Sequence, residues 1–324
     1  MGRLVDGQWI GDDLMASDKE GRFQRPETTL RNWITPDGSP GPSGEGGFKA
    51  ESGRYHLYVA QACPWAHRTL ILRAIKGLAP HISVDIVHPD MLDDGWTFET
   101  GLEGTTGDTL GGAAFLRDVY LRAVPDFSGR VTVPVLWDKH TGKIVSNESA
   151  EIIQMFNTAF NGLTGDTQDF YPEPLRGEID LVNTRVYATL NNGVYRSGFA
   201  RSQAAYDEAV HELFDTLDWL EARLAETKFV AGDVATLADW RLLPTLLRFD
   251  CVYHTHFKCN RARIIDYPHL WDYARGLYQW PGVSETMHFS NTMRHYFASH
   301  ESINPHRIVA VGPNVDWMAP VASA

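Results

Sequence analysis

The chain has 324 residues, of which 43% are hydrophobic and 22% are charged, a composition that excludes a wholly disordered, collagen-like or coiled-coil protein. Its length suits about two domains. With 29 Lys and Arg against 41 Asp and Glu, the net charge of −12 makes the chain a poor candidate for a nucleic-acid binder.

The compartment is predicted from features that the sequence lacks. No apolar run approaches the roughly 18 residues that span a bilayer, so we expect no membrane partner. The first residues do not show the basic and then apolar pattern of a secretory signal. Three cysteines, Cys63, Cys251 and Cys259, are too few and too odd in number for a disulfide scaffold. These features together predict a cytoplasmic protein.

Residues 1–54 are predicted to form an N-terminal extension. Its segment 36–53 is rich in glycine and proline, which is typical of an irregular loop. Several apolar side chains before that loop indicate that parts of the extension pack as an arm on the body of the protein.

Strand and helix patterns alternate over residues 55–165, which predicts an α/β domain. Strands are expected at 55–60 and 82–87, and a hairpin is expected at 131–137 and 143–145. Helices are expected at 64–76, 113–124 and 149–160. The glycine-rich stretch 88–112 between them is long enough to be an inserted loop near a site.

The remainder of the chain is predicted to be an all-helical domain, residues 175–324, after a turn-rich linker. Helices are expected at 177–195, 202–226, 236–256 and 267–280. Thr236 and Asp239 form a capping-box pattern at the start of one of them. The segment past residue 290 looks less regular.

Cys63 is the first candidate for chemistry, because it lies between a predicted strand and a helix that opens with Pro64. The helix amides and dipole at that position favour a thiolate, which is the reactive form. Ala66 stands where a local resolving cysteine would be, so the thiol that resolves a reacting Cys63 comes from elsewhere, most simply from a small molecule. The alternative is a buried cysteine that serves as a small apolar filler.

Two further motifs allow both a binding role and an ordinary structural one. A cis bond at Val133–Pro134 would leave the Val133 backbone to pair with a peptide-like ligand, whereas an edge-strand proline is the other interpretation. Glu148 and Ser149 open a predicted helix, where they suit the charged groups of an amino acid or simply cap the helix.

The cluster Cys251, His254, His256 and Cys259 suggests zinc, but its spacing is not that of common zinc modules. Residues 254 and 256 point about 200° apart on one continuous helix. We therefore expect no metal site here.

Five runs in the same order resemble the glutathionyl-hydroquinone reductases, the Xi class of the glutathione transferases: residues 61–67 (QACPWAH), 94–98 (DGWTF), 146–149 (SNES), 191–195 (NNGVY) and 248–260 (RFDCVYHTHFKCN). The Val133–Pro134 dipeptide fits the same family. The resemblance implies a thioredoxin-like N-terminal domain that binds glutathione and a helical C-terminal domain with the quinol side of the site. It also implies a homodimer.

Residue roles follow from the resemblance. Cys63 is implied to be the nucleophile. Glutathione, the co-substrate, is implied to contact Trp96, Arg130, Val133, Glu148 and Ser149. The quinol is implied to lie against Tyr195, Tyr253 and Tyr296, whose phenols offer a ring face and a hydroxyl donor. For each of these tyrosines the alternative is an ordinary core residue.

The implied reaction removes glutathione from a small aromatic conjugate. The Cys63 thiolate attacks the thioether sulfur, the hydroquinone leaves with a proton from the tyrosines, and a second glutathione resolves the mixed disulfide. Two other functions remain open at this point. One is an omega-like thiol transferase or dehydroascorbate reductase that uses the same cysteine, and the other is a noncatalytic interaction module.

Overall fold

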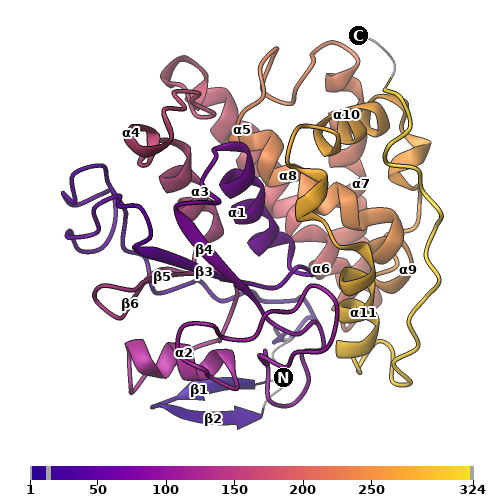
Figure 1. Ribbon diagram of the computed structural model, residues 1–324. Coiled ribbons are helices and arrows are strands. Elements are labelled where there is room, and N and C mark those ends of the chain that lie inside the picture. The colour runs from indigo at the N-terminus through magenta and orange to yellow at the C-terminus, as the bar shows by residue number, and fades with distance from the viewer. Residues whose placement is uncertain (1, 12–15, 322–324) are drawn as a thin grey trace. The chain divides into compact units, whose positions relative to one another are not determined.

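The computed structural model describes residues 2–11 and 16–321, and they group into two compact units (Figure 1). The first unit draws on the ranges 1–14, 27–168 and 285–299, and the second on 15–26, 169–284 and 300–324. Each unit thus collects segments that are far apart in the sequence. The domain boundaries predicted at residues 54, 165 and 175 stay predictions.

A four-stranded sheet forms the centre of the first unit, in the order β4-β3-β5-β6. β3 (Tyr55–Val59) runs parallel to β4 (Ile82–Ile86) and antiparallel to β5 (Val135–Asp138), which pairs antiparallel with β6 (Lys143–Ser146). Every residue of β3 is buried, as suits a central strand that is covered on both faces. The predicted parallel pair and antiparallel hairpin are confirmed.

Helices lie on both sides of this sheet (Figure 1). α1 (Pro64–Ile75) connects β3 to β4 and packs against α3 (Ser149–Thr158). α2 (Leu116–Ala123) contacts β6 and lies on the opposite side of the strands in Figure 1. The short α4 (Asn161–Thr164) ends at Gly165, which adopts the left-handed conformation. A mixed sheet between such helices is the thioredoxin-like arrangement that the resemblance implies.

The chain opens with a hairpin that the sequence interpretation missed, formed by β1 (Gly2–Val5) and β2 (Gln8–Gly11). Asp6 and Gly7 have φ angles of 48° and 74°, as the central residues of a tight hairpin turn require. Leu4 exchanges backbone hydrogen bonds of 3.0 and 2.9 Å with Gly129, which attach the hairpin to the rest of the first unit.

The second unit is helical. Its α-helices are α5 (Arg176–Val186), α6 (Gly193–Gly198), α7 (Gln203–Leu224), α8 (Leu237–Arg248), α9 (His254–His256) and α10 (Pro268–Tyr278). Its 3-10 turns include η1 (Glu173–Leu175) and η4 (Ile264–Asp266). The capping box of Thr236 and Asp239 is present at the start of α8, as predicted. No helix among the described residues is long and apolar enough to cross a membrane.

Two of the predicted helices are interrupted by π-helical turns. η2 (Tyr187–Asn191) separates α5 from α6, and η3 (Phe249–Tyr253) separates α8 from α9. The helical period alone does not reveal one extra residue in a turn, so the sequence predicted continuous helices. Such turns are frequent at functional sites, and both carry or adjoin predicted quinol-side tyrosines.

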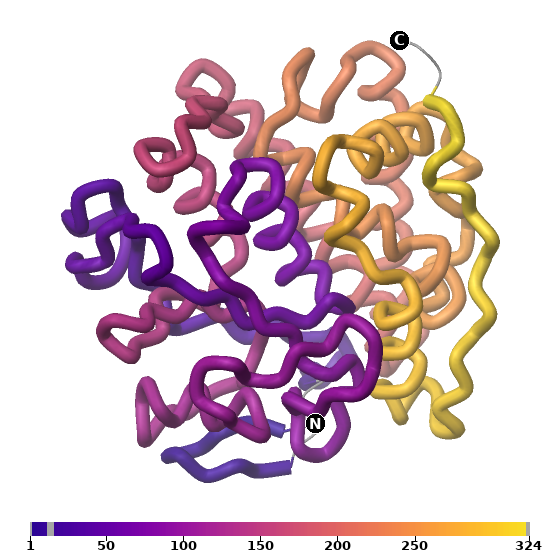
Figure 2. The backbone as a smooth tube through the Cα atoms, in the orientation of Figure 1, coloured from indigo at the N-terminus to yellow at the C-terminus, as the bar shows by residue number. Residues whose placement is uncertain are grey.

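The chain past residue 290 differs from the irregular tail that was predicted. After η5 (Ser284–Thr286), α11 (Phe289–Ser299) belongs to the first unit and buries one face. The following residues return to the second unit as an extended segment, drawn in yellow in Figure 2. Near its end, Trp317 packs its ring 4.8 Å from that of Trp271.

Candidate active site

Cys63 is the N-cap residue of α1. Its backbone is extended (φ −76°, ψ 119°), and Pro64 takes a position in the first helical turn where its missing amide removes no helical bond. The side chain is half-buried. The sequence therefore folds locally so that one sulfur stands at the positive end of the α1 dipole.

The sulfur of Cys63 lies beside a cis peptide bond. Its Sγ is 3.6 Å from the carbonyl oxygen of Val133, to which the thiol donates. The Val133–Pro134 bond is cis. The Cys63 side chain makes no capping hydrogen bond with the amides of α1, so the positive end of the α1 dipole is what favours its thiolate.

A buried cation connects α1 with the start of α3. Arg68 is 1% exposed, donates through Nη1 to the Ser149 hydroxyl at 3.4 Å, and lies 4.5 Å from the centroid of the Trp65 ring. Its neighbour His67 is also buried and has Nε2 2.8 Å from the Thr286 hydroxyl. The positive charge of Arg68 thus stands close to the α3 terminus, where an anionic group of a ligand is favoured.

Glu148 caps α3, and Ser149 is the first residue of that helix. One carboxylate oxygen of Glu148 accepts from the Ala150 amide at 3.0 Å, and the other accepts from the Thr28 hydroxyl at 3.0 Å. The motif therefore caps α3, as the structural interpretation predicted. The second oxygen and the Ser149 hydroxyl leave the motif equally suited to a ligand's amino and carboxylate groups.

The segment around residues 28–32 borders this motif, which the sequence did not reveal. The backbone N–H of Asn147 donates to the Leu30 carbonyl at 3.0 Å, and the backbone N–H of Asn32 donates to the Val145 carbonyl at 2.7 Å. Arg31 forms an ion pair with Glu151 of α3. These residues occur in a stretch without helical or strand period, so no pattern could have placed them at the site.

Trp96 is 6% exposed and stacks on His295 of α11. The ring centroids are 4.9 Å apart and the planes are inclined by only 20°. The backbone carbonyl of Trp96 accepts from the Leu116 amide at 2.9 Å, which fixes the loop against the start of α2. His295 is a residue that the sequence interpretation missed.

Arg130 is half-buried in the link between α2 and β5, three residues before Val133. The preceding Gly129 is held by its two backbone bonds to Leu4 of the N-terminal hairpin. Four of the residues predicted to contact glutathione thus lie in the first unit with Cys63: Arg130 and Val133 in the link before β5, and Glu148 and Ser149 at the start of α3. The fifth, Trp96, lies in the loop 88–112 of the same unit.

The tyrosines divide between the two units. Tyr195 of α6 and Tyr253 of η3 lie in the second unit with ring centroids 6.2 Å apart, and Phe257 packs 5.5 and 5.6 Å from them. The Arg25 guanidinium lies 4.7 Å from the Tyr195 ring. Tyr296 is in α11 of the first unit, with its ring 5.2 Å from that of His295.

The residues 62–159 match the family model of the glutathione S-transferase N-terminal domain, and 203–276 match that of the C-terminal domain. The chain is 54% identical to the glutathionyl-hydroquinone reductase YqjG of Escherichia coli K12, over 99% of this chain and 98% of that protein. A glutathione-bound structure of YqjG matches with a TM-score of 0.92 at 52% identity, covering 99% of this chain and 98% of the other.

Two other similar proteins indicate the class of glutathione transferase to which the chain belongs. Glutathionyl-hydroquinone reductase PcpF of Sphingobium chlorophenolicum is 48% identical over 97% of this chain and 96% of its own length. A Xi-class transferase from Natrialba magadii matches with a TM-score of 0.92 at 47% identity, covering 99% and 97% of the two chains. The chain is a Xi-class glutathione transferase.

The other cysteines of this Xi-class transferase differ from Cys63 in their surroundings. Burial raises the pKa of Cys251 and of Cys259 to about 12 in each case, so both are thiols at neutral pH. His256 pairs with His300, with Nε2 and Nδ1 3.1 Å apart. In the part of the chain that the structure describes, no three His, Cys, Asp or Glu side chains are grouped to hold a metal ion.

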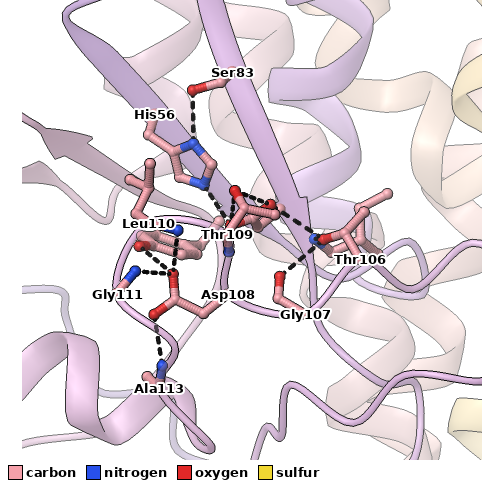
Figure 3. Close-up of polar contacts among 12 residues, drawn as sticks. His56, Ser83, Thr106, Gly107, Asp108, Thr109, Leu110, Gly111 and Ala113 are labelled. Atoms are coloured by element: carbon pink, nitrogen blue, oxygen red, sulfur yellow. Dashed lines mark hydrogen bonds and ion pairs between the residues drawn. The ribbon is translucent and has the colours of Figure 1, made fainter.

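The glycine-rich loop that carries Trp96 is fastened to the sheet by a buried polar network (Figure 3). His56 lies between Ser83 and Asp85, at 2.7 and 3.2 Å, and Asp85 accepts from the Thr109 amide at 2.7 Å. Burial would raise the pKa of Asp85, but the bonds from His56 and Thr109 outweigh it and lower the pKa.

A second carboxylate fixes the turn that follows in the same loop (Figure 3). Asp108 accepts from the amides of Leu110, Gly111 and Ala113 at 2.9–3.1 Å and from the Tyr58 hydroxyl at 3.1 Å. These contacts hold the end of the loop predicted at 88–112 against the sheet of the first unit.

Proposed function

We propose that this chain is an enzyme that reduces glutathionyl-hydroquinones to hydroquinones, with glutathione as co-substrate and Cys63 as the nucleophile. The activity is that named for YqjG and PcpF, which the chain matches over nearly its whole length. The observation that carries the proposal is the position of Cys63: a half-buried sulfur at the N-terminus of α1, 3.6 Å from the backbone of Val133.

The surroundings of Cys63 fit a glutathione molecule. The backbone of Val133, just before β5, suits pairing with a cysteinyl backbone, and the α3 terminus with Ser149 and Arg68 suits the γ-glutamyl carboxylate. Glu148 suits the γ-glutamyl ammonium group. Trp96 and Arg130 are assigned to the other end of the tripeptide, where an indole face and a guanidinium bind a peptide plane and a carboxylate.

In the first step the Cys63 thiolate attacks the sulfur that joins glutathione to the aromatic ring. The new S–S bond forms as the carbon–sulfur bond breaks, and the electron pair of the broken bond stays with the ring carbon, which takes up a proton. The ring is thereby reduced by two electrons, and Cys63 and the glutathione sulfur are oxidised to a mixed disulfide.

In the second step a free glutathione thiolate attacks the glutathione sulfur of that disulfide. Oxidised glutathione leaves, and the Cys63 thiolate is restored. One substrate and one glutathione thus give one hydroquinone and one oxidised glutathione. A single thiol suffices for the cycle, in agreement with Ala66 at the position of a resolving cysteine.

The tyrosines are proposed to hydrogen-bond the quinol oxygens as the ring carbon is protonated. Tyr195 and Tyr253 support this role together, because two phenols with centroids 6.2 Å apart can address one ring. Tyr296 is assigned to the same role on the strength of the resemblance and of its position beside His295.

The test compares three substrates on one enzyme: a glutathionyl-hydroquinone, dehydroascorbate and a glutathione mixed disulfide. The proposal predicts that kcat/KM is highest for the glutathionyl-hydroquinone and that Cys63→Ala removes that activity while glutathione still binds in calorimetry. A preference for dehydroascorbate or for the mixed disulfide identifies an omega-like enzyme instead. Absence of turnover with all three favours the noncatalytic module.

We also propose a homodimer and a cytoplasmic location. Three free cysteines and a need for reduced glutathione support a reducing compartment. Size-exclusion chromatography with light scattering measures the molar mass directly, and a value near the 36.4 kDa of one chain contradicts the dimer.

A further inference from the structure

Helix α11 makes hydrogen bonds and an ion pair with three consecutive residues, 89–91, of the loop that carries Trp96. His295 Nδ1 is 2.7 Å from the Pro89 carbonyl, the Arg294 guanidinium pairs with both oxygens of Asp90 at 2.8 and 2.7 Å, and the Met91 amide donates to the Ser299 hydroxyl at 3.0 Å. All of these contacts lie within the first unit. One helix thus holds the loop at residues 89–91, in addition to the Asp85 and Asp108 network at the other end of the loop.

His295 has two separate contacts with this loop. Its ring covers Trp96, and its Nδ1 faces the carbonyl of Pro89. A carbonyl oxygen only accepts, so Nδ1 carries the proton and the tautomer is set. Because His295 and Trp96 are each 6% exposed, the stack excludes water from most of both rings.

The same face of α11 reaches the segment that leads to Cys63. Asn291 lies one turn before His295 and donates through Nδ2 to Gln61 Oε1 and to the Glu103 carbonyl, both at 2.8 Å. Gln61 is two residues before Cys63, and Glu103 is in the loop beyond Trp96. One face of α11 therefore connects the loop of Trp96 with the segment between β3 and α1 that leads to Cys63.

We propose that His295 is a positioning residue, which holds the Trp96 indole in the orientation that binds glutathione. The inference depends on the proposed function only in that Trp96 contacts glutathione. Without a neighbouring ring, an indole on a loop has several rotamers, and selecting the one that binds the ligand costs affinity. A ring stacked on the indole selects that rotamer before the ligand arrives, so removal of the ring weakens binding without touching the reacting sulfur.

The test separates the ring from the hydrogen bond. His295→Phe keeps a stacking ring and loses the donor, whereas His295→Asn keeps a donor near the Nδ1 position and loses the ring. His295→Leu is a second variant without a ring, for use if the Asn variant is unstable. Ser290→Ala is the matched control, since Ser290 is exposed in the same helix and its hydroxyl contacts His288.

Calorimetry with glutathione should show that His295→Asn raises Kd about tenfold, which is about 1.4 kcal/mol. His295→Phe and Ser290→Ala should stay within about twofold of the wild type. In steady-state assays the Asn variant should show the change in the KM for glutathione, with kcat at saturation nearly unchanged. A merely structural role would instead lower stability and kcat together.

A double mutant distinguishes failure of this inference from failure of the site assignment. If His295 acts through Trp96, the pair Trp96→Ala and His295→Asn binds glutathione no more weakly than Trp96→Ala alone. Two outcomes overturn the positioning role alone. One is that the losses of the two substitutions add up in the double mutant. The other is that folded His295→Asn and His295→Leu keep the wild-type Kd while Trp96→Ala binds glutathione weakly. A wild-type Kd in Trp96→Ala overturns both the assignment of Trp96 and the inference.

Discussion

The Cys63 sulfur lies 3.6 Å from the carbonyl oxygen of Val133, so the candidate nucleophile and the backbone proposed to pair with glutathione are neighbours in space. Seventy residues of sequence separate them. The distance is short enough that a glutathione held on the Val133 backbone has its own sulfur close to Cys63. Disulfide exchange and attack on a thioether both need that proximity.

Labelling with iodoacetamide should distinguish Cys63 from the other two cysteines. At about pH 6, we expect fast alkylation of Cys63 alone, because the pKa of Cys251 and of Cys259 is raised to about 12 by burial. Peptide mass spectrometry locates the label. Cys251→Ser is the matched variant and should keep the labelling rate. Equal labelling of all three cysteines in the folded protein would show that burial does not protect two of them.

The phenols of Tyr195 and Tyr253 should act as a pair. Tyr195→Phe and Tyr253→Phe are each expected to lower kcat by about tenfold to a hundredfold, because a donor to the quinol oxygen is lost. The double variant should lose less than the product of the two effects, since both donors serve one ring. Tyr206→Phe, which removes a hydroxyl that donates to the Lys258 carbonyl, is the control. Unchanged kcat in both single variants would exclude the role.

The N-terminal hairpin should influence glutathione binding through the loop of Trp96. Trp9 donates through Nε1 to the Asp93 carbonyl at 3.1 Å, and Arg117 lies 4.9 Å from its ring while pairing with Asp94. Trp9→Ala is expected to raise the KM for glutathione by about threefold to tenfold, as for indirect couplings near 1 kcal/mol.

The control for the hairpin is Ile10→Ala, a change of an exposed neighbour in the same strand. Its KM should equal that of the wild type. If Trp9→Ala also leaves KM unchanged, the hairpin serves stability alone. Urea denaturation of the same two variants would then show a lower free energy of unfolding for Trp9→Ala than for Ile10→Ala.

The Asp85 carboxylate should stabilise the fold in a pH-dependent manner. Its pKa is lowered in the folded state, so its contribution is complete above the ordinary aspartate value of about 3.9 and is lost as pH falls through the lower, folded value. Asp85→Asn is expected to lower the free energy of unfolding by about 1–3 kcal/mol at neutral pH. Exposed Asp233→Asn is the control, and urea titrations between neutral and acidic pH measure both. A difference that grows toward low pH would contradict the sign.

Local signals in the sequence were sufficient for much of the fold. The apolar period and Pro64 located α1, and the Thr236 capping box located α8, because these features depend on neighbours within a few residues. The turn Asp6–Gly7 carries an equally local hairpin signal that was missed. The π turns could not be predicted, since one extra residue in a helix hardly changes its apolar period.

The site was only partly accessible to the same reasoning. Cys63 and the start of α3 follow from helix-terminus chemistry, whereas Trp96 and the tyrosines were identified by resemblance. The stack of Trp96 on His295 joins two segments that lie 199 residues apart (295 − 96) in the sequence, and neither segment contains a pattern that points to the other. Such contacts are decided by tertiary packing, which a single sequence does not display.

The most direct test of the central claim is a single turnover of a glutathionyl-hydroquinone by the enzyme without free glutathione, followed by intact-mass and peptide mass spectrometry. The account predicts one equivalent of hydroquinone released and one glutathione bound by disulfide to Cys63, which added glutathione then removes. Release of hydroquinone with Cys63 unmodified, or with glutathione on another residue, would contradict it.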